Sequence, residues 1–123
     1  MPYWTDESPK ISHIVVEMVA GDSIERNSLK MGLAKLLRSL RLHPVSGGMV
    51  DHVFPRKGYT LIQTLKESHI AFHVWPESLY AHVDIVTCKT GAASLWEYST
   101  EEIKKCFIEH FNPTAIRVCL WWY

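Results

Sequence analysis

Apolar and polar residues alternate in several short runs of this chain, and a two-residue period is typical of strands with one buried face. These runs predict six strands, at residues 13–19, 49–54, 59–65, 69–75, 79–88 and 114–122. Two other segments space their apolar residues three or four apart, as one face of a helix requires. The expected order along the chain is therefore strand, helix, four strands, helix, strand.

The first predicted helix lies within residues 22–41, and the following segment, 42–48, breaks it with Pro44 and a glycine pair. The second begins at Ser99, where Ser99 and Glu102 have the spacing of a capping box. The apolar stripes of the two helices are Leu29, Leu33, Leu36, Leu37 and Leu40 in the first, and Ile103, Cys106, Phe107 and Phe111 in the second.

Two helices cannot cover both faces of so broad a sheet, and a sheet must bury at least one face. We therefore predict an α+β fold, a two-layer α/β sandwich in which a mainly antiparallel sheet packs both helices on one face. The 123 residues suffice for one domain, residues 1–123. The second face of the sheet is then either solvated or covered by a second copy.

Alternation along residues 69–75 and 79–88 separates an apolar side of these strands from a mixed side. The apolar side suits helix packing, and it comprises Ile70, Phe72, Val74, Ala81, Val83, Ile85 and Thr87. The mixed side comprises His69, Ala71, His73, Trp75, Tyr80, His82, Asp84, Val86 and Cys88. Such a mixture on one sheet face indicates a site, an interface or both.

Composition narrows the class of protein. Thirteen basic and thirteen acidic residues give a net charge of zero, so the chain lacks the excess positive charge that would favour nucleic acid or an anionic membrane. Its uncharged stretches are too short for a membrane span. Cys88, Cys106 and Cys119 form no close pair, which favours a reducing cytoplasm over a disulfide scaffold.

Ser68, His73 and Cys88 are the candidates for chemistry. A serine hydrolase is disfavoured, because the sequence has no GxSxG elbow at a strand-to-helix turn. A metal site is not expected either. His69 and His73 are four residues apart on a strand, whereas that spacing grips zinc on a helix, and the chain has no CxxC pair.

The run ESHIAFHVWPE, followed by YAHVDIVTC, closely resembles the prokaryotic S-adenosylmethionine decarboxylase proenzymes, which are pyruvoyl-dependent. The pattern is a Glu67-Ser68 cleavage site, His73 five residues after the serine, and Cys88 fifteen residues after the histidine. The upstream run FPRKGYT is similar to a further family motif.

The resemblance implies self-cleavage between Glu67 and Ser68, into chains 1–67 and 68–123. Ser68 then becomes a pyruvoyl group that forms a Schiff base with the substrate, with neither pyridoxal phosphate nor metal. His73 is the implied proton acceptor in processing, an imidazole suited to proton transfer near neutral pH. Thr60 supports processing where the family usually has serine, and Cys88 is the implied proton donor to the product.

The resemblance also implies the substrate, S-adenosylmethionine, whose decarboxylated product donates the aminopropyl group in spermidine synthesis. Phe54 and Trp75 match aromatic positions of the nucleoside pocket, and Glu77 matches the carboxylate that holds the ribose hydroxyls. Arginine or ornithine decarboxylation by the same pyruvoyl chemistry is the alternative, with Asp84 as the residue for a distal cation. A second alternative is an unprocessed homologue with a binding or regulatory role.

A homodimer is expected from the uncovered sheet face, because symmetric pairing is the commonest way to cover it. Family members of this length resemble half of a four-layer αββα sandwich, which is the arrangement that two copies would make. No nucleic acid or membrane partner is expected.

Overall fold

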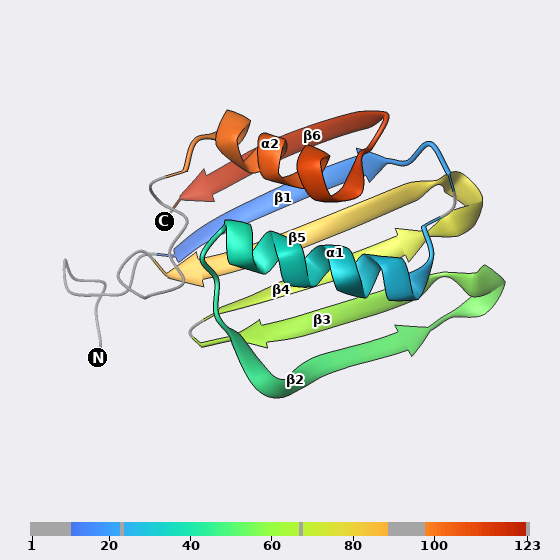
Figure 1. Cartoon of the computed structure of the whole chain (residues 1–123), viewed down its shortest axis with the longest axis horizontal. Coiled ribbons are helices and arrows are strands. Elements are labelled where there is room, and N and C mark those ends of the chain that lie inside the picture. Colours follow the sequence, from blue (N-terminus) through green and yellow to red (C-terminus); the bar gives the residue numbers. More distant parts are fainter. Residues whose placement is uncertain (1–10, 23, 67, 89–97, 123) are drawn as a thin grey trace, which may run out of the picture.

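The computed structural model describes residues 11–22, 24–66, 68–88 and 98–122, without the side chains of Lys57 and Trp122. Within these residues, six strands form one antiparallel sheet in the order β2-β3-β4-β5-β1-β6 (Figure 1). The elements are β1 (Ile11–Val19), α1 (Arg26–Ser39), β2 (Pro44–Val53), η1 (Pro55–Lys57), β3 (Tyr59–Leu65), β4 (Ser68–Trp75), η2 (Pro76–Ser78), β5 (Tyr80–Cys88), α2 (Thr100–Phe111) and β6 (Ala115–Trp122).

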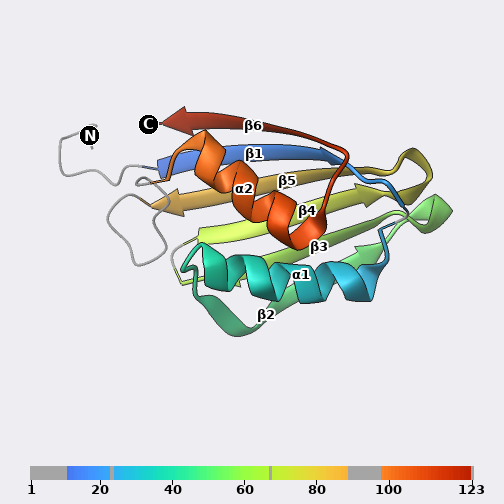
Figure 2. The same ribbon diagram turned by 45° about the horizontal axis from the view of Figure 1, so that its top comes forward.

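Both helices lie on the same face of the sheet, α1 over its β2 half and α2 over its β6 half (Figures 1 and 2). The predicted element order and two-layer architecture are therefore confirmed. The helix face holds the core, in which the stripe residues of α1 and α2 meet the apolar sides of the strands. Phe72 and Phe107 are the largest fully buried side chains of the described residues.

The helix starts follow from local hydrogen bonding. The carboxylate of Glu25 accepts from the backbone N–H groups of Asn27 and Ser28, at 3.2 and 3.3 Å, before α1. The predicted capping box is present at α2. Ser99 Oγ accepts from the Glu102 N–H at 3.1 Å, and the Glu102 carboxylate accepts from the Ser99 N–H at 3.3 Å.

β2 differs from its prediction, because it begins at Pro44 rather than Met49 and ends at Val53. A proline is tolerated here since β2 is an edge strand, so the missing N–H interrupts no pairing on the outer side. The register shifts between Pro44 and Met49, and Gly47 within that stretch has φ +72°, a value that glycine adopts without strain.

The sheet surface away from the helices, here called the open face, carries the mixed sides of β4 and β5, as predicted. Their residues are partly exposed, except Ala71, which is 7% exposed. Apolar side chains also lie uncovered on this face. Val50 is 66% exposed and Trp121 is 58% exposed. They pair with Ile62 and His13, and residues paired directly across strands share a face of the sheet.

Candidate active site

Thr60 and His73 form one part of the candidate site on the open face. They are directly opposite each other on β3 and β4, and Thr60 Oγ1 lies 3.1 Å from His73 Nδ1. His82 is the next residue across the sheet, with its ring 6.1 Å from that of His73. Thr60, predicted only as a hydroxyl that supports processing, thus contacts His73 directly, and this hydrogen bond fixes the orientation of the imidazole.

An aromatic cluster continues from His73 toward the end of β4. The Trp75 ring lies 6.5 Å from His73, 6.0 Å from Phe54 and 5.6 Å from Tyr80, measured between centroids. Tilted rings at these separations are in favourable contact. Glu77 follows in η2, where its side chain is exposed. Phe54 and Trp75, the two aromatic residues predicted for a nucleoside pocket, thus lie together, with Glu77 two residues beyond Trp75.

Ser68 lies at the opposite end of β4, as its first residue. It pairs with Leu65, a buried residue of the helix face, so the serine side chain is directed toward the helix layer. Its Oγ is buried and has no hydrogen-bond partner among the described residues. A hydroxyl buried in that way carries a desolvation cost. Glu67, the other half of the predicted cleavage site, lies outside the described residues.

Cys88 ends β5 at the same end of the sheet as Ser68. The register shows this, because Val86 pairs with His69, and Cys88 follows two residues later. The thiol is half-buried on the open face. Ser68 and Cys88 therefore belong to one end of the β4–β5 pair.

One chain does not bring Ser68 and His73 together. Five residues of extended strand separate them, which at about 3.3 Å per residue is about 17 Å, and their side chains point to opposite faces. The candidate residues thus form two groups at opposite ends of one strand pair. The serine end holds Ser68 and Cys88, and the histidine end holds Thr60, His73, Phe54, Trp75 and Glu77.

Sequence patterns did not reveal the hydrogen bonds that connect Tyr80, beside Trp75, to the neighbouring strands β1 and β6. Tyr80 Oη donates to Glu17 Oε2 at 2.7 Å, and Arg117 donates to Glu17 Oε1 at 2.9 Å. Asp84, the residue named for a basic amino-acid substrate, instead contacts the ring of His13 through a hydrogen bond. These contacts join β5, β1 and β6, and only the strand register could have predicted them.

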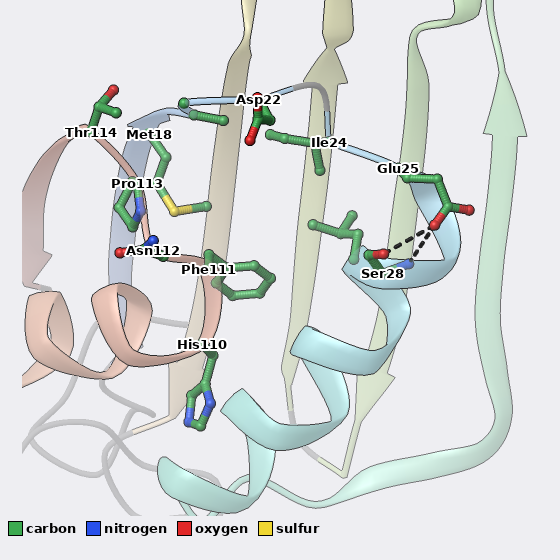
Figure 3. Close-up of a pocket in the computed structure, with 13 residues that line it drawn as sticks. Met18, Asp22, Ile24, Glu25, Ser28, His110, Phe111, Asn112, Pro113 and Thr114 are labelled. Atoms are coloured by element: carbon green, nitrogen blue, oxygen red, sulfur yellow. Dashed lines mark hydrogen bonds between the residues drawn. The ribbon is translucent and has the colours of Figure 1, made fainter.

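A cavity of about 360 Å³ lies on the other side of the sheet, between the start of α1 and the end of α2 (Figure 3). Asp22, Glu25, His110 and Phe111 line it, and it contains none of the candidate site residues. In the described part of the chain, no three metal-binding side chains gather closely enough to hold an ion. No helix among those residues is long and apolar enough to cross a membrane.

Fold and site together define a two-layer α+β domain with two groups of candidate side chains at opposite ends of the β4–β5 pair. Residues 12–120 match the family described as S-adenosylmethionine decarboxylase. The match spans nearly the whole chain, and the protein belongs to that family.

Individual relatives are similar over shorter stretches. S-adenosylmethionine decarboxylase proenzyme of Parasynechococcus marenigrum is 50% identical over 40 residues, 32% of this chain and 31% of the relative. The proenzyme of Acetivibrio thermocellus is 35% identical over 68 residues, 54% of this chain and 52% of the relative. The matched stretches therefore span about a third to a half of these curated relatives.

A solved structure confirms the fold. The adenosylmethionine decarboxylase of Aquifex aeolicus superimposes with a TM-score of 0.69, over 92% of this chain and 89% of that one. At 22% identity the likeness concerns the fold alone.

Proposed function

We propose that this chain is the proenzyme of a pyruvoyl-dependent S-adenosylmethionine decarboxylase that cleaves itself between Glu67 and Ser68. The observation that carries the proposal is the buried Ser68 hydroxyl, which has no hydrogen-bond partner among the described residues. A hydroxyl without a partner is available to attack the carbonyl of the preceding residue, which turns the amide into an ester. β-Elimination then removes the Ser68 α-proton, releases the 1–67 chain with a free carboxylate, and leaves dehydroalanine as the first residue of the 68–123 chain. Water hydrolyses this residue to the pyruvoyl group, and the former serine nitrogen leaves as ammonia.

The candidate residues at both ends of the strand pair have chemistry that suits the group that this reaction makes. A pyruvoyl group at position 68 would supply an electron sink for decarboxylation, as pyridoxal phosphate does in other enzymes. Cys88, at the same end of the sheet, would hold the proton that the product α-carbon receives. Phe54 and Trp75 would stack on the adenine or attract the sulfonium, and Glu77 would accept from the ribose hydroxyls.

We further propose that a second copy completes the site. His73 must reach the α-proton of Ser68 for the elimination, and within one chain about 17 Å of strand separates them. A second sheet placed face to face, with reversed strand direction, would lay its His73 over the first copy's Ser68 and Cys88.

Exposed apolar residues support such a dimer. Val50, Ile62 and Trp121 lie uncovered on the open face, at 66%, 36% and 58% exposure. Water-exposed apolar side chains on a face that also carries polar groups are typical of a protein interface. The proposed assembly is the four-layer αββα homodimer, working in the cytoplasm on a small-molecule substrate.

S-adenosylmethionine is the proposed substrate rather than arginine or ornithine. The aromatic pair Phe54–Trp75 offers stacking surface, with ring centroids 6.0 Å apart, whereas the carboxylate of Asp84 is already engaged by His13. A distal cation would therefore compete with an existing partner. The product would serve as the aminopropyl donor in spermidine synthesis.

The test is carbon dioxide release from each carboxyl-labelled substrate in turn. Only S-adenosylmethionine should turn over, and Glu77→Gln should raise its KM, because an amide accepts hydroxyl hydrogen bonds less strongly than a carboxylate. Turnover of ornithine or arginine, without turnover of S-adenosylmethionine, would overturn the nucleoside assignment and leave the pyruvoyl chemistry standing. Full-length protein without any turnover would instead support the regulatory alternative.

A further inference from the structure

Tyr80 links the aromatic cluster to the far edge of the sheet. It is the first residue of β5, and its ring lies 5.6 Å from that of Trp75. Its hydroxyl donates to Glu17 of β1 at 2.7 Å, and Arg117 of β6 donates to the same carboxylate at 2.9 Å. The chain Arg117–Glu17–Tyr80–Trp75 therefore crosses four neighbouring strands.

The hydrogen bond between Tyr80 and Glu17 persists over a wide pH range. The hydrogen bond from Tyr80, followed by that from Arg117, lowers the pKa of Glu17 below its usual value of 4.5, so the carboxylate remains an acceptor. Burial, followed by the hydrogen bond to Glu17, raises the pKa of Tyr80 to about 12, so the hydroxyl remains a donor. The position of the Tyr80 ring is therefore fixed at neutral pH.

We propose that Tyr80, held by Glu17, is a positioning residue that sets the Trp75 indole for recognition of the nucleoside. This inference rests on the proposed function, since it concerns the same site. The Trp75 ring lies 6.0 Å from that of Phe54, just before η1, and 5.6 Å from that of Tyr80. Of these two neighbours, Tyr80 is the one that the hydrogen bond to Glu17 holds in place. Without the hydrogen bond from Tyr80 to Glu17, the Trp75 indole would populate other rotamers. Nucleoside binding would then have to restrict the indole to one rotamer, and this entropic cost would lower the affinity.

The turn that precedes Tyr80 strengthens the inference, because it also carries Glu77. Leu79 adopts φ +50°, and its N–H donates to Pro76 O at 3.1 Å. Ala20 N–H donates to Leu79 O at 2.8 Å, which ties this turn to the end of β1. The ribose-binding candidate and the anchor of the stacking candidate thus belong to one rigid turn.

The experiment compares wild-type protein with Tyr80→Phe and Glu17→Ala, which remove the donor and the acceptor of this bond, by calorimetric binding of 5′-methylthioadenosine, an adenosine thioether that lacks the reacting amino acid. Each variant should raise the dissociation constant about five-fold, the value of one ordinary hydrogen bond. The double variant should bind no more weakly than either single one, because both remove the same bond. In the decarboxylation assay, Tyr80→Phe should raise KM and leave kcat within about two-fold.

Tyr59→Phe is the matched control. It also removes a tyrosine hydroxyl bond, to Ile24 O at 3.3 Å, but on the helix face, and should leave nucleoside affinity unchanged. Unaltered affinity in Tyr80→Phe would overturn this inference alone. Wild-type protein that neither binds the nucleoside nor releases carbon dioxide would overturn both proposals. Weaker binding in Tyr80→Phe together with loss of the dimer in light scattering would also overturn it, because the effect would then come from the interface.

Discussion

The two ends of the β4–β5 strand pair differ in how their polar groups are satisfied. At the histidine end, Thr60 and His73 are hydrogen-bonded, and Trp75 packs between ring neighbours. At the serine end, the buried Ser68 hydroxyl lacks a partner among the described residues. The histidine end therefore has its polar side chains engaged, whereas the serine end keeps a hydroxyl that, under the proposed function, is available for self-cleavage.

This difference teaches that residues close in sequence need not act together within one chain. Ser68 and His73 are five residues apart, yet an extended strand places them at opposite ends and on opposite faces. Under the proposed function, a strand of a second copy that runs the other way would bring its histidine end to this serine end. The open face of the sheet offers the surface on which a second copy can do so.

The largest expected effect concerns the serine end. Ser68→Ala should abolish self-cleavage, because no hydroxyl then remains to attack the preceding carbonyl. Intact mass spectrometry should show only the full-length chain in the variant, and chains 1–67 and 68–123 in wild-type protein. Ser78→Ala is the matched control, since Glu77-Ser78 is also a Glu-Ser pair but lies exposed in η2. Cleavage in Ser68→Ala, or its loss in Ser78→Ala, would place the scissile bond elsewhere.

A smaller effect is expected at the histidine end. Thr60→Val keeps the shape of the side chain but removes the hydroxyl that contacts His73 Nδ1 at 3.1 Å. Processing should slow about ten-fold, less than the loss of a general base, which costs about 100-fold or more. Thr60→Ser restores the hydroxyl and should process at least as fast as wild-type protein, since serine rotates more freely about χ1 than threonine. The rate of appearance of the 68–123 chain measures both, and equal rates in Thr60→Val and wild type would remove Thr60 from the site.

Much of the fold could be predicted from the sequence, because strand and helix periods are local. The capping box at Ser99 and the apolar side of residues 69–75 needed no tertiary information. The start of β2 at Pro44 was missed, because proline and glycine indicate a break unless the segment is known to lie at a sheet edge.

The candidate site was predicted only as a set of residues. Motif spacing named Ser68, His73 and Cys88, but the division of this set into two ends depends on strand register. The Glu17–Tyr80 hydrogen bond likewise joins residues 63 apart in sequence, on strands that pair only in the folded sheet. Such contacts leave no local pattern, so sequence periodicity could not have found them.

The most direct test of the shared site is complementation between two inactive chains. Ser68→Ala lacks the reactive serine and His73→Ala lacks the base, so neither should cleave when expressed alone. The two chains are co-expressed, with a mass tag on one of them, so that mixed dimers form. In a mixed dimer, one site combines Ser68 of the His73→Ala chain with His73 of the Ser68→Ala chain, and the other site lacks both residues. Cleavage of the His73→Ala chain, and never of the Ser68→Ala chain, is the predicted result. Absence of cleavage in mixed dimers whose formation is verified by native mass spectrometry would contradict the account.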